Sequence, residues 1–331
     1  MWQQFIYTDS VGDNPYFVYT PETYRVEAPV PLFVMLHGCT QTALDFATGT
    51  SMNQLAEKQG FIVMYPQQTI KYNQGLCWNW FLPSNQQRGS GEPASIVGMI
   101  QSLQLNTANW TIDPNRIYVT GISAGAAMSV ILGATYPDVF AAIGVHSGLE
   151  YQAATNLVQA AKVMHRGGPD PLRQGSVAYT AMSNHSRVVP TIVFHGTADT
   201  IVAPLNGDQV VQQWIQTDYL ASDKTYAVDY HHPSSIATGQ VPGGYSYLTA
   251  VWNAPSGEAV QAYWKIDGMG HAWSGGNPAG SYTDPRGPDA TVAMYDFFMG
   301  HPREENAQQQ LTPLTRLRHM LTSIFHMKAE E

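Results

Sequence analysis

The chain has 331 residues, of which 44% are hydrophobic and 12% charged, and its formal net charge is −9. A chain of this size and composition can bury a large core and is typical of a globular protein. The negative charge argues against a nucleic-acid partner, because phosphate binding requires clustered lysine and arginine. No apolar run is long enough to cross a bilayer. The first residues lack the features of a signal peptide, which leaves either a cytoplasmic protein or one whose leader is absent from this sequence.

Short apolar runs typical of buried strands alternate with helical patterns along the chain. The predicted strands are residues 31–37, 61–66, 116–121, 141–146 and 191–195. The predicted helices are residues 43–59, 93–107 and 124–136. This alternation predicts an α/β fold with a mostly parallel sheet covered by helices on both faces. Two antiparallel hairpins are also expected, one from residues 3–8 and 16–20 and another from residues 245–252 and 259–266.

Two segments fall outside this alternation. Residues 165–187 have few periodic apolar positions and contain Gly167-Gly168-Pro169-Asp170-Pro171, so we expect a loop that is either a cap over a site or a surface excursion. Residues 1–300 are predicted to form a single domain. The tail, residues 301–331, is predicted to contain an amphipathic helix that starts at Pro313. That helix would dock on its own domain, at a dimer contact or on a surface.

The chain has two cysteines, Cys39 and Cys77. Two are too few for a disulfide scaffold, and their spacing alone leaves open either one bridge or two buried thiols. No histidine or cysteine cluster has the spacing of a zinc site, and the His231-His232 pair has no third ligand at suitable spacing. We therefore predict no metal site.

The most informative motif is Gly121-Ile122-Ser123-Ala124-Gly125. It lies between a predicted strand and a predicted helix, which is the context of a nucleophile elbow. Such an elbow exposes the serine at a tight turn and directs backbone N–H groups toward an oxyanion formed beside it. Without that context, the same letters would fit an ordinary glycine turn.

A serine nucleophile needs a base and an orienting acid, and the chain contains candidates in the order Ser, Asp, His. Asp199 follows a predicted strand, and His271 lies in a glycine-rich turn after another one. Both positions belong to the carboxyl edge of a parallel sheet, where sites of α/β proteins collect. Asp267 and Asp284 are fallback acids, each less well placed than Asp199.

The predicted oxyanion hole uses two backbone N–H groups, those of Cys39 and Ala124. Cys39 lies in His37-Gly38-Cys39-Thr40, between an early strand and the following helix, and Ala124 follows the serine. The remaining strand-end histidines are predicted to have supporting roles. His37 would brace the loop that contains Cys39, here called the oxyanion loop, and His195 would hydrogen-bond the loop that contains Asp199. His146 has a similar position.

Several motifs together resemble the poly(3-hydroxybutyrate) depolymerase family of esterases, which is related to the feruloyl and acetylxylan esterases of carbohydrate esterase family 1. The matching stretches are His37-Gly38-Cys39-Thr40-Gln41, Cys77-Trp78-Asn79-Trp80-Phe81, Arg88-Gly89-Ser90-Gly91-Glu92-Pro93, residues 121–128, His146-Ser147-Gly148 and residues 270–276. They extend over roughly residues 5 to 300 and are far more specific together than singly.

The resemblance implies an α/β-hydrolase fold, no cofactor, and Ser123, Asp199 and His271 as the catalytic triad. It also implies a Cys39–Cys77 bridge near the site and an extracellular or periplasmic location. Secreted depolymerases of this family usually carry a linker and a substrate-binding domain after the catalytic one, whereas this sequence continues into a short helix. Soluble oligomers and small esters are therefore the expected substrates, rather than crystalline polymer.

Three tryptophans are candidates for an apolar substrate pocket. Trp78 and Trp80 closely follow Cys77, and Trp273 follows His271 by two residues. Because tryptophans also belong to protein cores, packing is the alternative for each of them.

The sequence thus predicts a serine carboxylesterase that acts on short-chain esters or hydroxyalkanoate oligomers through an acyl-enzyme. The alternative is a feruloyl or acetylxylan esterase with the same triad and a different pocket. A non-catalytic hydrolase-like binding protein is the alternative from another class, although such proteins usually lack a triad member. The oligomeric state is not predicted.

Overall fold

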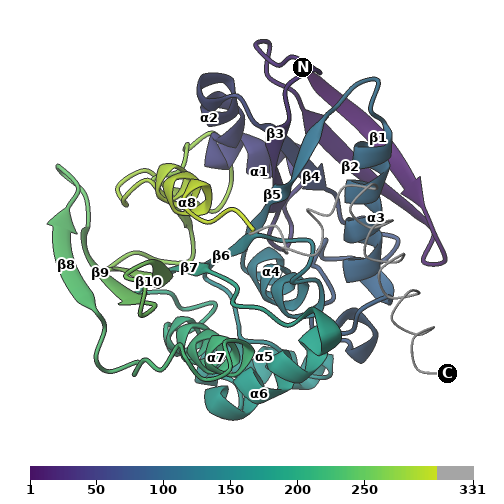
Figure 1. Cartoon of the computed structure of the whole chain (residues 1–331). Coiled ribbons are helices and arrows are strands. Elements are labelled where there is room, and N and C mark those ends of the chain that lie inside the picture. Colours follow the sequence, from purple (N-terminus) through teal and green to yellow (C-terminus); the bar gives the residue numbers. More distant parts are fainter. Residues whose placement is uncertain (304–331) are drawn as a thin grey trace, which may run out of the picture.

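The structure is a computed structural model that describes residues 1–303. The predicted helix starting at Pro313 lies outside the described residues. A ten-stranded sheet runs through the molecule in the order β1-β2-β4-β3-β5-β6-β7-β10-β9-β8, and a second sheet pairs two short strands, β11 with β12. Figure 1 shows the large sheet extending from β1 near the N-terminus to β8 at the opposite side.

Six neighbouring strands at the centre of the sheet, from β4 to β10, are parallel, and the pairs at both edges are antiparallel. The strands are β1 Trp2–Thr8, β2 Asp13–Tyr19, β3 Val30–Leu36, β4 Ile62–Pro66, β5 Ile112–Ile122, β6 Ala142–His146, β7 Thr191–Gly196, β8 Ser235–Gln240, β9 Ser246–Asn253, β10 Ala259–Ile266, β11 Trp273–Ser274 and β12 Thr283–Asp284. The α/β hydrolase arrangement with a mostly parallel sheet is confirmed, and so are both expected hairpins.

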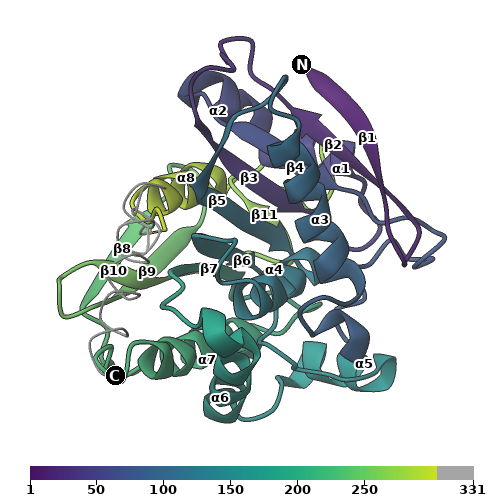
Figure 2. The same ribbon diagram turned by 45° about the vertical axis from the view of Figure 1, so that its right-hand side comes forward.

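Helices cover both faces of the sheet. The helices are α1 Ala43–Thr50, α2 Met52–Gln59, α3 Gly91–Leu105, α4 Ala124–Thr135, α5 Leu157–Arg166, α6 Pro171–Met182, α7 Leu205–Ala221 and α8 Ala290–Met299, with short 3₁₀ turns at Pro83–Asn85 and Ser183–His185. In Figure 1, α1, α2 and α8 lie on one side of the sheet and α3 to α7 on the other. Figure 2, turned by 45°, separates α5 from α6 and α7 and keeps α3 and α4 on the same face.

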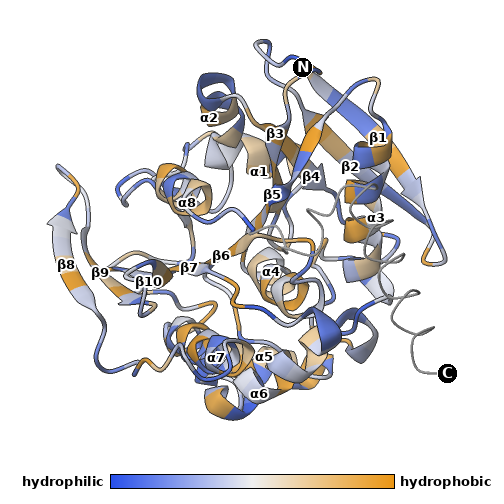
Figure 3. Cartoon of the chain, in the orientation of Figure 1, coloured by the Kyte–Doolittle hydropathy of each residue, from blue (hydrophilic) through white to orange (hydrophobic). Residues whose placement is uncertain are grey.

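The sheet separates two apolar layers, as its alternating side chains require. Along β3, Leu32, Val34 and Leu36 pack into the layer under α3 to α7. Phe33 and Met35 pack into the layer under α1, α2 and α8. Figure 3 shows the apolar residues concentrated on the central strands and on the helix sides that face them. Burial on both faces explains why these strands have continuous apolar sequences.

One predicted helix is divided. Residues 43–59 form α1 and α2, which meet at Ser51. Ser51 has a φ of 54°, in the left-handed region, so it ends one helix and starts the next. The Thr42 hydroxyl caps α1 by accepting from the Asp45 N–H. The helical pattern continues across the break, which is why the sequence indicated a single helix.

The prediction of a loop over residues 165–187 was wrong. The segment contains the end of α5, the whole of α6 and a 3₁₀ turn. Helix α6 begins at Pro171, and the Asp170 carboxylate caps it by accepting from the Leu172 N–H. The Gly-Gly-Pro-Asp-Pro stretch therefore connects two helices and starts the second one.

Helix α7 was not predicted from the sequence, because polar residues share its buried positions with apolar ones. Gln209, Gln213, Thr217 and Asp218 are all buried on it. Gln209 donates to the carbonyls at 168 and 169, and Asp218 accepts from the Val189 N–H. These hydrogen bonds satisfy the buried groups, but the polar positions interrupt the apolar periodicity that marks an amphipathic helix.

Glu150, shortly after β6, is buried without a hydrogen-bond partner. Its side chain is 3% exposed, and neither carboxylate oxygen accepts a hydrogen bond within residues 1–303. It lies against Gly168, where a Cβ would stand 2.4 Å from Glu150 Oε1. Burial, with a smaller contribution from Asp170, raises the pKa of Glu150 from 4.5 to about 9. The folded protein therefore holds this carboxyl group protonated at neutral pH.

We expect Glu150→Gln to remove a pH dependence of stability. Since the folded-state pKa is raised, Glu150 stabilises the fold at low pH, and this contribution declines as pH rises from about 5 to about 9. Relative to the wild type, the variant should gain about 4 kcal/mol in free energy of unfolding between pH 5 and pH 8. Urea denaturation at several pH values measures this, with the exposed Glu27→Gln as control. A stability difference independent of pH would mean that Glu150 is ionised in the folded state.

Candidate active site

Ser123 lies at the turn between β5 and α4, as the motif predicts. Its φ of 58° and ψ of −122° are unusual for a residue other than glycine and indicate a strained backbone. The Ser123 N–H donates to the carbonyl of His146 at 3.0 Å, which secures the turn to β6. The side chain therefore projects from a backbone conformation that the neighbouring strand maintains.

The glycines around Ser123 are required by close packing. A Cβ on Gly125 would lie 2.1 Å from the Leu36 carbonyl oxygen, and one on Gly121 would lie 2.5 Å from the same atom. No L side chain fits at these distances, so only glycine lets α4 start directly against the end of β3. This contact brings the turn at Ser123 beside the loop that follows β3.

Asp199 and His271 come together although 72 residues separate them. His271 Nδ1 lies 2.7 Å from Asp199 Oδ2. The other carboxylate oxygen, Oδ1, accepts the N–H groups of Ile201 and Val202, each at 2.9 Å. Asp199 follows β7, and His271 lies between β10 and β11, so the pairing of β7 with β10 brings the two loops to one edge of the sheet.

Hydrogen bonding keeps Asp199 ionised despite its burial. Burial acts to raise the pKa of Asp199, but hydrogen bonds from His195 and His271 outweigh it and hold that pKa well below its usual range. An ionised carboxylate only accepts hydrogen bonds, so His271 presents its Nδ1–H to Asp199. The lone pair of Nε2 is then available to act as a base.

Ser123 and His271 line one pocket of about 100 Å³. The lining residues are Gly38, Cys39, Gln41, Ile122, Ser123, Met164, Ile201, His271 and Tyr282. Within residues 1–303 the Ser123 hydroxyl makes no hydrogen bond to His271. Such contacts are often long before a substrate is bound. The sides formed by Ile122, Met164 and Ile201 are apolar.

The loop after β3 places the Cys39 N–H near Ser123. Cys39 lines the same pocket, and its N–H has no hydrogen-bond partner within residues 1–303. The neighbouring Gly38 N–H is engaged by Gln41 Oε1 at 2.8 Å. The Ala124 N–H belongs to the first residue of α4, so it has no carbonyl one turn earlier in that helix. Both N–H groups are thus open to a ligand oxygen.

A disulfide joins Cys39 to Cys77, as the family resemblance implied. The Thr40 N–H also donates to the Gly75 carbonyl at 2.7 Å, so two bonds hold the loop after β3 to the segment around Cys77. This decides between the alternatives that cysteine spacing left open, a bridge and two free thiols.

His37 supports the loop after β3, which contains the predicted oxyanion donor Cys39. Its Nε2 accepts from the Gln68 N–H at 3.0 Å, so the ring proton is on Nδ1, which donates to the Gly38 carbonyl at 2.8 Å. Burial lowers the pKa of His37 to about 4, although the bond to Gly38 acts in the opposite direction. His37 is therefore neutral at pH 7 and serves as a fixed support.

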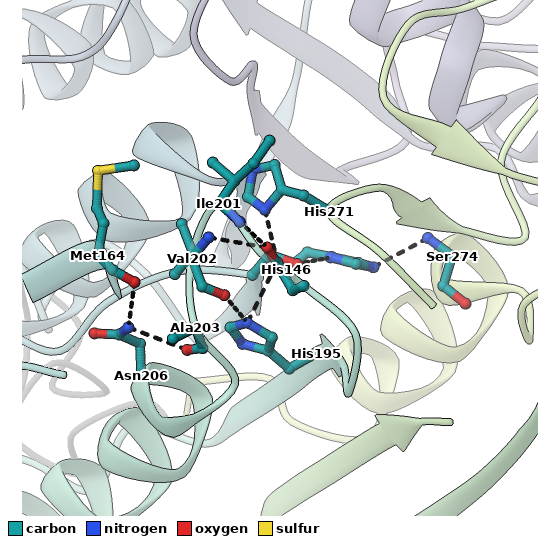
Figure 4. A network of polar contacts seen from close by, with 11 residues as sticks. His146, Met164, His195, Ile201, Val202, Ala203, Asn206, His271 and Ser274 are labelled. Carbon is teal, nitrogen blue, oxygen red and sulfur yellow. Dashed lines mark hydrogen bonds and ion pairs between the residues drawn. The ribbon is translucent and has the colours of Figure 1, made fainter. Parts of the chain in front are cut away.

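His195 and His146 support the other two loops, as Figure 4 shows. His195 Nε2 donates to the Val202 carbonyl at 2.8 Å and lies 3.4 Å from Asp199 Oδ2. His146 Nε2 accepts from the Ser274 N–H at 3.0 Å, while the His146 carbonyl holds Ser123. One residue therefore contacts both the serine turn and the segment that follows His271.

The alternative candidates lie elsewhere. Asp267 bonds the Thr197 hydroxyl, and Asp284 pairs with Arg286, so neither fallback acid contacts His271. In the part of the chain that the structure describes, no group of three or more His, Cys, Asp and Glu side chains could hold a metal ion. No helix there is long and apolar enough to span a membrane.

The three tryptophans expected at the substrate pocket do not line it. Trp78, Trp80 and Trp273 are 4%, 5% and 1% exposed. Trp78 Nε1 donates to the His37 carbonyl, and Trp273 Nε1 donates to the Thr291 hydroxyl. Their rings support the loops of the site from the core. The apolar lining comes instead from Ile122, which lies within the serine motif, and from Met164 and Ile201, which no motif marks in the sequence.

The described chain is an α/β hydrolase with serine, histidine and aspartate side chains gathered at the carboxyl edge of its sheet. A solved acetyl xylan esterase from Aspergillus awamori shares the fold, with a TM-score of 0.70 at 22% identity over 90% of this chain and 99% of that one. The family model described as "Esterase PHB depolymerase" matches residues 15–227, and the chain belongs to that family.

Two curated proteins with different named activities are similar to this chain in sequence. Poly(3-hydroxyalkanoate) depolymerase C of Paucimonas lemoignei is 37% identical over 267 residues, which are 78% of this chain and 59% of the relative. Acetylxylan esterase A of Emericella nidulans is 30% identical over 277 residues, 78% of this chain and 82% of the relative. The matched region thus spans less than two thirds of the depolymerase and most of the acetylxylan esterase.

Proposed function

We propose that this protein is a serine carboxylesterase and that residues 1–300 are its catalytic domain. The observation that carries the proposal is the convergence of Ser123 and His271 on one pocket, with Asp199 bound to the far side of the imidazole. Family membership supports the same reaction, because the relatives are named as a depolymerase and esterases.

In the proposed mechanism, His271 Nε2 takes the proton of the Ser123 hydroxyl as Oγ attacks the ester carbonyl. The N–H groups of Cys39 and Ala124 bind the resulting oxyanion. The tetrahedral intermediate collapses, His271 gives its proton to the departing alcohol, and an acyl-enzyme remains. Water activated by the same imidazole then releases the acid. Asp199 keeps the imidazole in the required tautomer throughout.

The size of the pocket supports short acyl groups. About 100 Å³ is well below the roughly 300–1,000 Å³ of pockets for drug-sized ligands. Acetyl and hydroxybutyryl groups are therefore the acyl groups that we propose, as short-chain esters or hydroxyalkanoate oligomers. Acetylated xylan is the second candidate substrate, because the match to acetylxylan esterase A extends over 82% of that relative.

We also propose an extracellular or periplasmic location. The Cys39–Cys77 bridge supports it, since disulfides persist mainly in oxidising compartments.

A fluorophosphonate probe tests the proposed chemistry directly. We expect the probe to form one adduct on Ser123, found by peptide mass spectrometry, and to abolish ester hydrolysis in proportion to labelling. Hydrolysis rates for methyl 3-hydroxybutyrate dimers, p-nitrophenyl acetate, methyl ferulate and acetylated xylan then separate the substrate classes. A folded protein that neither binds the probe nor cleaves any of these esters would be a hydrolase-like binding protein instead.

A further inference from the structure

Tyr282, in the segment between β11 and β12, has an unfavourable backbone conformation. Its φ is 50°, in the left-handed region that a bulky aromatic residue rarely occupies. The Tyr282 carbonyl accepts from the Trp273 N–H at 2.7 Å, so the conformation is held by β11. Strain of this kind persists only where surrounding contacts compensate for it, and it concentrates at functional sites.

The contacts that compensate for the strained backbone of Tyr282 connect its segment to the oxyanion loop. The Ser281 N–H donates to Asp45 Oδ1 at 2.9 Å, and Gln41 Nε2 donates to the Ser281 carbonyl at 3.0 Å. Gln41 also accepts the Gly38 N–H, so a single side chain connects the oxyanion loop to the residue before Tyr282. The phenol ring is thereby positioned relative to the oxyanion loop.

The Tyr282 ring lies at the mouth of the pocket. It lines the cavity with Ser123 and His271, and 41% of the residue is exposed. Its plane is inclined by 79° to the His271 imidazole, with 6.3 Å between the ring centroids. This exposed aromatic surface, beside Ser123 and His271, is available to a ligand in the pocket.

The hydrogen bonds of Thr40 determine what the Tyr282 hydroxyl offers to a ligand. Thr40 Oγ1 donates its one proton to the Cys39 carbonyl at 2.6 Å. Thr40 Oγ1 is also 3.3 Å from Tyr282 Oη. Because a threonine hydroxyl has a single proton, Tyr282 must be the donor in that contact. Tyr282 Oη therefore has its proton occupied and presents lone pairs to the pocket.

The other polar groups of the pocket either form hydrogen bonds within the protein or are assigned to the proposed oxyanion hole. Gln41 bonds Gly38 and Ser281, and the N–H groups of Cys39 and Ala124 are the proposed oxyanion donors. Among the side chains outside the proposed triad that line the pocket in the described structure, Tyr282 combines free acceptor capacity with an exposed position, whereas Gln41 is 2% exposed.

We propose that Tyr282 is a specificity-determining residue that accepts a hydrogen bond from a hydroxyl group of the ester beside the scissile bond. This inference rests on the proposed esterase function. The hydroxyl belongs either to the acyl chain, as in a 3-hydroxyacyl ester, or to the alcohol, as in a partly acetylated sugar. Both sources present the same O–H donor to the same acceptor.

Two isosteric pairs of esters test the proposal with the wild type and Tyr282→Phe. Methyl 3-hydroxybutyrate and methyl 3-methylbutyrate differ by OH against CH₃ on the acyl side, and 2-hydroxyethyl acetate and propyl acetate differ likewise on the alcohol side. We expect the variant to lose roughly 5- to 10-fold in kcat/KM for the hydroxylated member of one pair and less than about twofold for its methyl counterpart. The pair that responds identifies the side that bears the hydroxyl.

Thr40→Ala provides the matched second variant. It removes the acceptor that occupies the Tyr282 proton, so the phenol becomes able to donate. We expect kcat/KM for methyl acetoacetate, which carries a 3-oxo acceptor in place of the hydroxyl, to rise relative to methyl 3-hydroxybutyrate in this variant. Equal effects of Tyr282→Phe on both members of each pair, or no effect on either pair, would overturn the proposal.

The controls separate this inference from the proposed function. Fluorophosphonate labelling of Ser123 at the wild-type rate shows that Tyr282→Phe retains a folded site. If Ser123→Ala still cleaves all four esters, the esterase proposal itself fails. If hydrolysis depends on Ser123 but Tyr282→Phe does not discriminate between hydroxyl and methyl, the inference about Tyr282 alone fails.

Discussion

Replacing Ser123 by alanine should lower kcat for p-nitrophenyl acetate by about four to six orders of magnitude. The substitution removes the proposed nucleophile, and water has no comparable position against the ester carbonyl. His271→Ala should cause a similar loss, and the double variant should lose little more, because the members of a triad act as a unit. Stopped-flow and long-time hydrolysis assays with active-site titration measure the remaining rate.

Ser129→Ala is the matched control for this prediction. Ser129 is a buried serine on α4, and its hydroxyl donates to the Gly125 carbonyl at 3.0 Å. Its replacement should leave kcat within a few-fold of the wild type. Hydrolysis by Ser123→Ala at a rate close to that of the control would rule out Ser123 as the nucleophile.

Removal of the disulfide should have the largest effect on stability. The bridge closes a loop between cysteines 38 residues apart, so the double variant Cys39→Ser, Cys77→Ser should lose about 3–4 kcal/mol in free energy of unfolding. We also expect kcat to fall, because the Cys39 N–H is a proposed oxyanion donor and the bridge limits its motion. Urea denaturation and ester hydrolysis, measured on the same preparations, report both effects.

A reducing agent provides the control for the bridge. Dithiothreitol should move the wild-type unfolding midpoint toward that of the double serine variant and leave the variant unchanged. If the wild type and the variant unfold at the same urea concentration without reductant, then the hydrogen bonds around Thr40 and Gly75 hold the loop without help from the bridge.

Much of the fold was predictable because its signals are local. The central strands are buried on both faces, so each is a continuous apolar run bounded by polar or glycine residues. The turn at Ser123 was recognisable because a strand, a small-residue turn and a helix follow one another within a few residues. Helices whose buried faces are apolar, such as α4, were predicted for the same reason.

The predictions failed where side chains satisfy one another across the fold. Helix α7 buries glutamine, threonine and aspartate that bond the α5–α6 connection and the residues just before β7, so polar positions interrupt its apolar pattern. The break at Ser51 depends on a left-handed backbone that no local residue requires. Trp78 and Trp273 lie near site residues in the sequence, but their N–H groups find partners in the core.

The sequence by itself determined the family, the central α/β pattern and the order of Ser123, Asp199 and His271, because each depends on short stretches of backbone and their periodicity. The tertiary structure decided which side chains meet: the contact of His271 with Asp199 across 72 residues, and that of Thr40 with Tyr282 across 242. It also decided the size of the pocket and its lining by Met164, Ile201 and Tyr282. These features arise where strand ends and loops from the whole chain converge, and no local sequence pattern encodes such a distance.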